Sequence, residues 1–346
     1  MSRKLKMRSI IMGLFLALGV LLFVVLIWRT GINEIIGTLR NFSFLHFCII
    51  FGITALYYML YAVRWWIILR SLTKKKVNFI SLFFHRLSDY AISYLTPSAS
   101  TGGAPMRVLL LEHDKISTKT ATSSVVIDKG LEIASLFIFQ AVAIFIAIVS
   151  DTLPPQIKWL ALIILGIFIV ILFWFYYASV KRKGVFSSVI NALRLHRLGT
   201  VKKWMSKILE IEHQMAEFYK NHWKIFISLI PISVVITTSY LIEHWLIAHY
   251  MGVDLTFTQL FLVSTLPYIS YMIPVPGGIG LFEGGHAAIF AALGIEINAL
   301  VFVFIIRIRD LGFILLGLLH ASRQGVQMVQ NAFTKKKKLK KPQDLL

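Results

Sequence analysis

Acidic residues are scarce in this chain, and charged residues of either sign are few. Asp and Glu together number 16 among 346 residues, and charged residues make up 15% of the sequence. Soluble domains usually carry about 25% charged residues, whereas hydrophobic residues alone make up 57% of this chain. The composition therefore excludes a soluble domain of ordinary size and predicts an all-α integral membrane protein, a polytopic helical bundle.

Cysteine is almost absent, since Cys48 is the only one. A single thiol cannot form a disulfide framework, and its apolar surroundings predict a packed core thiol. The sequence also lacks an HExxH motif, a P-loop, a nucleophile elbow and a second clustered set of histidines. These absences argue against an enzyme, and we expect no catalytic residue, no metal site and no cofactor.

Basic residues outnumber acidic ones, so the formal net charge is +20. Lys and Arg gather in four segments: 1–9, 70–76, 181–224 and the tail from Lys335. Few lie in the connections at 30–44, 150–158 and 250–257. Because cationic loops resist translocation, the basic segments and both termini are predicted to be cytoplasmic. The charge is thus mainly a topology signal, with attraction to anionic lipid headgroups as a second role and no visible module for nucleic acid.

Six apolar runs are long enough to cross a membrane as helices. They are residues 10–28, 45–69, 121–149, 157–180, 224–249 and 298–320. No small-residue cleavage site follows the first run, so it is expected to be a retained span of the cytoplasmic membrane. The chain then divides into a basic N-terminus at 1–9, one membrane domain at 10–320 and a basic tail at 321–346. Within the domain, apolar residues at three- and four-residue spacing predict cytoplasmic amphipathic helices in 181–223.

Two further apolar regions are interrupted by proline and glycine, at 96–107 (TPSASTGGAPMR) and 274–285 (PVPGGIGLFEGG). Lipid cannot satisfy the free N–H and C=O groups of irregular backbone, so such breaks persist only inside protein or beside a watery cavity. The loop charges require each broken region to begin and end on one side of the membrane, which predicts two re-entrant helix pairs.

With these re-entrant pairs, the halves 10–149 and 157–320 have the same order of spans and opposite orientation. This is an inverted-topology repeat, an arrangement typical of secondary transporters. The same hydropathy also fits two full crossings in each broken region, which would give eight or more spans.

Each break leaves an ionisable residue where hydrocarbon is expected: Arg107 in the first and Glu283 in the second. Arg107 could bind a lipid phosphate with two N–H groups or extend to the membrane interface. Gly277, Gly278 and Gly280 permit positive φ angles and close approach to the backbone. If a helix begins at Leu281, its free N–H groups form an anion site, with Glu283 in the first turn as either a functional group or a cap.

Other ionisable residues interrupt the apolar runs and are candidates for a polar pathway. Asp128 and Lys129 begin one span together with Glu132, and Lys129 lies close enough to neutralise one of these acids. Glu243 and His244 lie deep in another span. Arg307 is spaced to pair with Asp310 on one helix face, whereas Arg309 needs a separate partner. Arg64, beside Trp65 and Trp66, is predicted to be an interface anchor.

The motifs around both breaks resemble the membrane domain of the lysylphosphatidylglycerol synthetase and flippase family. Members carry a P-G-G-x-G-x-x-E pattern, which Pro276, Gly277, Gly278, Gly280 and Glu283 match. A second pattern, G-G-E-P-x-R, corresponds to residues 102–107, with Ala104 in place of the acid. An acid–arginine pair of the family appears as Asp128 and Lys129, which keeps the charge and loses the planar fork of arginine.

The resemblance covers about residues 10–320 and implies a lipid-translocating module without the soluble aminoacyl-transfer domain of the larger members. It implies membrane lipids as partners, with a phospholipid or lipid-linked headgroup, and it leaves open a homo-oligomer and a separate lipid-modifying enzyme. Two alternatives remain: an intramembrane enzyme that uses Glu283 and His286 on a lipid headgroup, and a membrane scaffold in which the polar breaks only fold the chain.

Overall fold

The computed structural model describes Trp28, Gly37 and residues 42–98, 100–150, 155–180, 184–192 and 199–339. The predicted first span, 10–28, lies outside the described residues except for Trp28. Where the chain is described, its regular secondary structure is helical, in agreement with the all-α prediction. The helices are α3 (Phe44–Leu72), α4 (Phe79–Leu95), α5 (Ala104–His113), α6 (Thr118–Val149), α7 (Pro155–Val180), α8 (Val185–Ala192), α9 (Gly199–Asn221), α10 (Trp223–Tyr250), α11 (Phe257–Thr265), η2 (Leu266–Met272), η3 (Pro276–Gly278), α12 (Leu281–Ala292) and α13 (Ala299–Leu339).

Polar side chains set where several of these helices begin. Ser43, Asn78, Ser117 and Thr256 accept hydrogen bonds from backbone N–H groups in the first turns of α3, α4, α6 and α11. These N–H groups have no partner within the helix, so a capping side chain fixes the first residue of each helix. The sequence thus places helix starts at the ends of the apolar runs.

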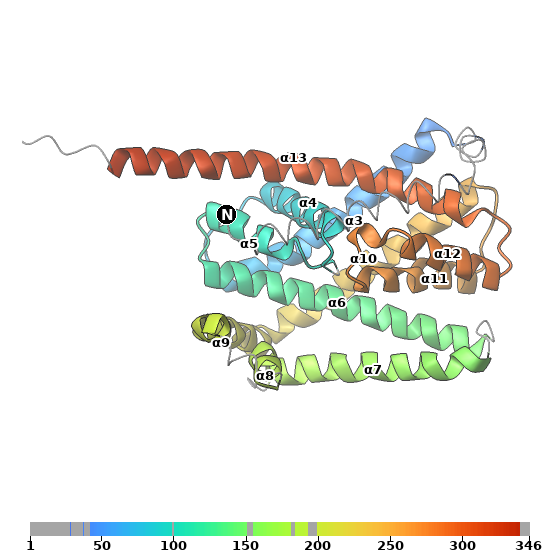
Figure 1. Cartoon of the computed structure of the whole chain (residues 1–346), viewed down its shortest axis with the longest axis horizontal. Coiled ribbons are helices and arrows are strands. Elements are labelled where there is room, and N and C mark those ends of the chain that lie inside the picture. Colours follow the sequence, from blue (N-terminus) through green and yellow to red (C-terminus); the bar gives the residue numbers. More distant parts are fainter. Residues whose placement is uncertain are drawn as a thin grey trace, which may run out of the picture.

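The long helices extend along the longest axis of the molecule, and the short ones fill its two ends (Figure 1). Three of them, α3, α6 and α10, are apolar enough and long enough to cross a membrane. Helices α8 and α9 lie at one margin, near an end of α6 and α7. The helical bundle and its membrane-length helices confirm the predicted fold class.

Each broken region leaves the bundle at the end where it entered. Helices α4 and α5 pack against each other near one end of the bundle, and α11, η2 and α12 pack together near the other (Figure 1). The first pair follows the end of α3 and leads into the start of α6, while the second connects α10 with α13. Within the described residues, this is the arrangement that a re-entrant helix pair requires.

The two halves of the chain are interleaved. Helix α4 packs against α3 of its own half and α13 of the other, and α11 packs in the same way against α10 and α6. At Gly317 on α13 a Cβ atom would lie 2.2 Å from the carbonyl oxygen of Leu87, so only glycine allows α4 this close. Helices α3 and α10 contact each other between the halves.

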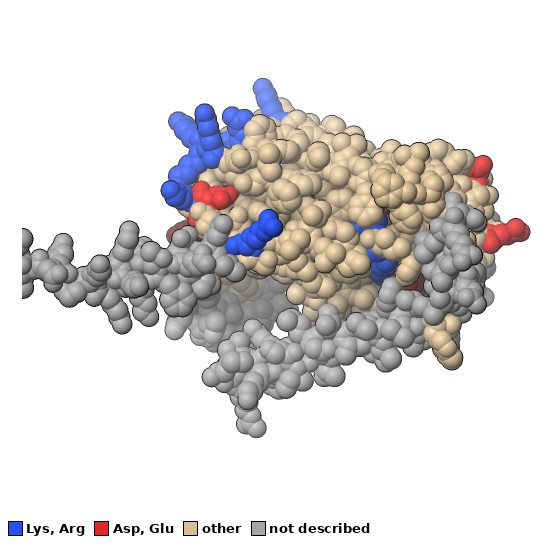
Figure 2. Space-filling view, turned by 90° about the horizontal axis from the view of Figure 1, so that it is seen from above, with Lys and Arg blue, Asp and Glu red and all other residues tan. Residues whose placement is uncertain are grey.

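The surface separates charge by position. Most of the visible Lys and Arg gather at one end, with a small acidic patch beside them, and Asp or Glu appear at the other end (Figure 2). The exposed acids Asp254 and Glu296 lie in the α10–α11 and α12–α13 loops. Between these ends the visible surface is mostly uncharged, with exposed leucine, isoleucine and phenylalanine side chains on the spanning helices. This distribution is typical of a protein that crosses a bilayer.

One sequence prediction is wrong here. The apolar surroundings of Cys48 predict a packed core thiol, but its side chain is exposed on the outer face of α3, beside Leu45 and Ile49. An apolar run predicts that a residue avoids water, and it does not distinguish a core position from a lipid-facing one.

The placement of the loops can be tested by labelling. In a Cys48→Ser background, Asp254→Cys should react with an impermeant maleimide in intact cells, and Lys75→Cys should react only after permeabilisation, because their loops lie at opposite ends of the bundle. Gel-shift detection of the labelled protein measures both. Equal labelling of the two positions in intact cells would contradict the arrangement.

Candidate functional site

Asp128 on α6 lies at the centre of a buried ionic network. Its two carboxylate oxygens accept hydrogen bonds from Arg64 Nε of α3 at 2.8 Å and from Arg107 Nη2 of α5 at 2.7 Å. Asp128 and Arg107 are fully buried, and Arg64 is 1% exposed. Charge-assisted bonds of this kind stabilise ions that would otherwise be costly inside a membrane.

A second set of charges continues this network toward the first break. Arg86 on α4 donates to Asp89 and, at 2.9 Å, to Glu132 of α6. Lys129 donates to Glu132 and to the carbonyl oxygen of Ser100 in the break, both at 3.2 Å, and lies 3.5 Å from Asp89. We call the whole set the first network; it contains Arg64, Arg86, Asp89, Arg107, Asp128, Lys129 and Glu132.

Glu283 connects the second break to α13. Its Oε2 accepts the N–H of Gly280 at 2.7 Å, so the carboxylate caps α12, and Oε1 accepts from Arg307 Nε at 2.8 Å. The helix does begin at Leu281 as predicted. The acceptor at that helix end is the protein's own carboxylate, in the place where the sequence suggests a phosphate.

Arg309 on α13 holds the remaining acids. Its Nε lies 3.0 Å from Glu243 Oε1 of α10, its Nη1 lies 3.5 Å from Asp310, and the same Nη1 donates to the hydroxyl of Tyr57. Glu243 is therefore the separate partner that Arg309 requires. We call Glu243, Glu283, Arg307, Arg309 and Asp310 the second network.

The two breaks meet inside the bundle. Gly277 has φ +58°, and a Cβ atom there would lie 2.6 Å from the ring of Tyr94 on α4, so glycine is required for both backbone and space. Ser100 of the first break donates to the carbonyl oxygen of Tyr271 at 3.4 Å. Arg307 adds a bridge, since it donates to Gly277 O at 2.7 Å and to Tyr94 Oη at 2.6 Å. Gly278 and Gly280 also have positive φ angles.

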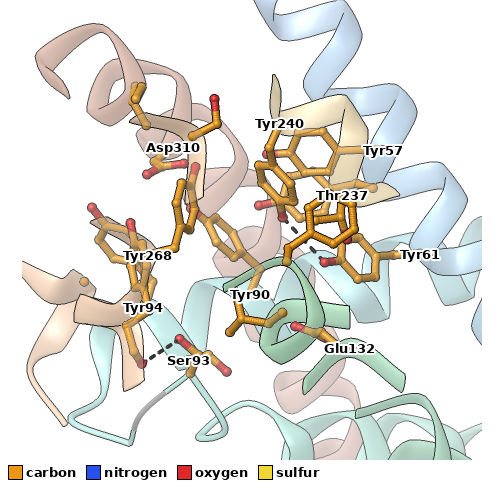
Figure 3. Close-up of a pocket in the computed structure, with 18 of the residues that line it drawn as sticks. Tyr57, Tyr61, Tyr90, Ser93, Tyr94, Glu132, Thr237, Tyr240, Tyr268 and Asp310 are labelled. Carbon is orange, nitrogen blue, oxygen red and sulfur yellow. Dashed lines mark hydrogen bonds between the residues drawn. The ribbon is translucent and has the colours of Figure 1, made fainter. Parts of the chain in front are cut away.

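A cavity of about 170 Å³ lies where the halves meet (Figure 3). Serine, threonine and glutamine side chains line it together with apolar groups and charged residues of both networks. Its most frequent lining residue is tyrosine, contributed by α3, α4, α10 and η2: Tyr57, Tyr58, Tyr61, Tyr90, Tyr94, Tyr240, Tyr268 and Tyr271. A concave space with aromatic walls and a few convergent polar groups is typical of a ligand site.

The predicted site residues divide into two groups around this cavity. Lys129, Gly277 and Arg309 line it. Two others contact lining residues, since Glu243 pairs with Arg309 and Arg307 donates to Tyr94 and Gly277. The remaining ones are outside the lining: Arg107, Asp128, Gly278, Gly280 and Glu283. Among the described residues, no three His, Cys, Asp or Glu side chains are placed to hold a metal ion.

Two sequence predictions about these charges are wrong. Arg64 is buried against Asp128 and is not an interface anchor, because the side chain lies on the face of α3 that packs against α6 and α10. Arg307 pairs with Glu283 instead of Asp310, which contacts Arg309.

The alternative of an intramembrane enzyme uses Glu283 together with His286. Among the described contacts, His286 Nδ1 bonds to the carbonyl oxygen of Phe282, and Glu283 accepts from Arg307 of α13.

Residues that sequence reasoning does not select contribute much of the lining. In the sequence, Arg86 and Asp89 only weaken the prediction of a span at 78–95, although an ionisable residue in an apolar run is itself a signal of function. The tyrosines carry no signal, since aromatic residues are frequent throughout the chain, with 12 Tyr and 26 Phe.

Residues at the same position in corresponding helices of the two halves make matching contacts, and a cation in one half corresponds to an acid in the other. Counted from the first residue of each helix, Arg64 holds the same position in α3 as Glu243 holds in α10. Thr54 and Ser233 are equivalent in the same way, in α3 and α10 respectively. Arg64 donates to Ser233 Oγ at 3.1 Å, and Glu243 accepts from Thr54 Oγ1 at 3.3 Å. Each charged residue therefore binds the hydroxyl group of the opposite half.

The correspondence extends to the last helix of each half. Asp128 and Arg309 hold the same position counted from the starts of α6 and α13, and they bind Arg64 and Glu243 respectively. Tyr61 and Tyr240 are likewise equivalent in α3 and α10, and their hydroxyl oxygens lie 3.5 Å apart. Both tyrosines line the cavity.

Comparison with known proteins places the chain beside other membrane proteins. Residues 10–317 match the family described as the lysylphosphatidylglycerol synthase TM region. A UPF0104 membrane protein of Pyrococcus horikoshii is 24% identical over 301 residues, covering 82% of this chain and 88% of the relative. A UPF0104 membrane protein of Methanothermobacter thermautotrophicus is 27% identical over 296 residues, covering 82% and 86%.

Because Arg64 belongs to the first network, replacing it should strongly lower the stability of the protein, although its sequence position resembles that of an interface anchor. Arg64→Gln should lower the free energy of unfolding by about 3 kcal/mol, because it removes one partner of a buried carboxylate. Arg70 is an exposed arginine of the same helix and stacks on Trp66. Arg70→Gln should change the free energy of unfolding by less than about 0.5 kcal/mol. Unfolding in detergent by denaturant titration measures both. Equal, small effects would restore the anchor interpretation.

Proposed function

Since the chain belongs to the lysylphosphatidylglycerol synthase TM region family, we propose that it moves a lipid, or another amphiphile with a polar or phosphate headgroup, across the cytoplasmic membrane. The proposal includes both termini on the cytoplasmic side. It describes transport without chemical change of the substrate. The observation that supports it best is the polar, tyrosine-lined cavity at the junction of the two breaks.

The cost of buried charge favours a working site over a purely structural one. Twelve ionisable side chains of the two networks lie between spanning helices, and an ion at the centre of a membrane helix costs about 2.5 to 3.5 kcal/mol on insertion scales. Apolar residues of similar volume would hold the helices together as well or better. The networks keep polar groups at the cavity wall, where a headgroup needs them.

The headgroup and the tails of an amphiphile have opposite requirements. A headgroup needs hydrogen-bond partners while it crosses the hydrocarbon, and the cavity offers them from α3, α4, α6, α10 and α13. The tails remain in the surrounding lipid, against the apolar outer faces of the same helices. A carrier of this type therefore needs a polar interior and an apolar exterior, which this bundle has.

The repeated contacts of the halves support an alternating mechanism. We propose that the chain is an inverted-topology repeat whose axis passes between Tyr61 and Tyr240. Two halves with the same fold and opposite orientation can exchange their conformations, which opens a central site first to one side and then to the other. The re-entrant pairs would be the moving elements, since each contacts both halves.

Blocking the cavity tests the proposal. Thr237 of α10 lines the cavity, whereas the adjacent Thr238 is exposed on the outer surface. In vesicles containing the purified protein and fluorescent phospholipids, Thr237→Trp should slow lipid movement about tenfold or more, because an indole fills space that a headgroup needs. Dithionite quenching of the outer leaflet measures the rate.

The matched control is Thr238→Trp, which adds the same group to the lipid-facing side of the same helix. Its rate should stay within about twofold of the unmodified protein, as for a surface change. Equal rates for both variants, with folded protein confirmed by thermal unfolding, would exclude the cavity as the route. A new lipid product in the vesicles would instead support the intramembrane enzyme.

A further inference from the structure

The charges of the two networks do not cancel separately. Formal charges in the first network comprise four cations and three carboxylates, so one positive charge is in excess. Those of the second comprise two cations and three carboxylates, so one negative charge is in excess. No described ion pair joins the two networks. The cavity therefore lies between groups of opposite net charge.

Members of both networks reach the cavity. Arg86 and Lys129 line it together with Glu132, which leaves one positive charge in excess, whereas Asp310 lines it together with Arg309, so the excess carboxylate of the second network lies among the members outside the lining. Figure 3 shows Glu132 and Asp310 on opposite sides of the tyrosine rings.

Asp310 is a lining residue with unused capacity to bind. Asp310 contacts Arg309 at 3.5 Å, which is longer than a charge-assisted hydrogen bond. Buried polar groups are normally satisfied, so a weakly held carboxylate at the cavity wall indicates a ligand.

The tyrosine rings suit a cation between these sides. An ammonium group is attracted to the faces of aromatic rings, and several rings together select for it. Tyr57, Tyr94 and Tyr271 accept hydrogen bonds from Arg309 or Arg307, so each hydroxyl still has its own proton to donate. The wall can thus hold an amine against the rings and donate to an anion.

We infer that the cavity binds a zwitterionic headgroup, with its phosphate toward Arg86 and Lys129 and its amine among the tyrosines toward Asp310. This rests on the proposed function and specifies its substrate class. A headgroup with one negative and one positive charge complements both networks. An anionic headgroup has no cation to match the second network. A headgroup with two amines carries two positive charges, one more than the single negative charge that the second network has in excess.

Three fluorescent lipids with the same tails test the inference in vesicles. One carries a phosphate and one amine, the second is the same lipid with its amine acetylated, and the third carries a phosphate and two amines. The first should move at least about tenfold faster than the others, since an unmatched buried charge costs more than about 1.4 kcal/mol. In Asp310→Asn, the amine and acetylated lipids should move at similar rates, while Asp254→Asn in an exposed loop keeps the preference.

A binding measurement keeps the inference testable if Asp310→Asn does not fold. Glycerophosphoethanolamine should raise the melting temperature of the unmodified protein in detergent, and its N-acetyl derivative at the same concentration should not. Equal effects of both compounds, or equal movement of all three lipids, would overturn the inference of a zwitterionic headgroup and would still be consistent with the proposed lipid transport. Movement of none of the lipids would reject the proposed function and the inference with it.

Discussion

The pairing of buried charges is the constraint on which this structure depends. An ion in hydrocarbon is tolerated only when a partner of opposite charge and well-placed hydrogen bonds compensate for lost water. Six cations and six carboxylates each have a partner of opposite charge within 4.0 Å across the two networks. Because partners come from different helices, the pairing fixes how α3, α4, α5, α6, α10, α12 and α13 lie relative to one another.

Irregular backbone follows the same logic. The two breaks expose N–H and C=O groups at membrane depth, and each meets polar partners that the networks provide. Lys129 binds the carbonyl oxygen of Ser100, and Arg307 binds that of Gly277. The charges thus stabilise the breaks, and the breaks meet inside the bundle, where tyrosines line the cavity.

The sequence predicted the elements well because membrane burial leaves a strong local pattern. Apolar length gave α3, α6, α7 and α10 within a few residues, and proline with glycine located both breaks. Ionisable residues in apolar runs identified Asp128, Glu283 and Arg309 as buried charges.

The partners of these buried charges could not be predicted from the sequence, because packing between distant segments determines them. Thr54 and Glu243, for example, are separated by 189 residues. Arg64 illustrates the difficulty, because its position beside two tryptophans is typical of an interface anchor, and only its helix face places it on Asp128.

The central claim is that the two breaks meet and form the transport site. In a Cys48→Ser background, cysteines at Ser100 and Tyr271 should be joined in the membrane by a short, reducible thiol crosslinker, because Ser100 Oγ lies 3.4 Å from Tyr271 O. The crosslink should stop lipid movement in vesicles, and reduction should restore it, since alternation requires the breaks to separate. Failure to form the crosslink, or full lipid movement in the crosslinked protein, would contradict the account.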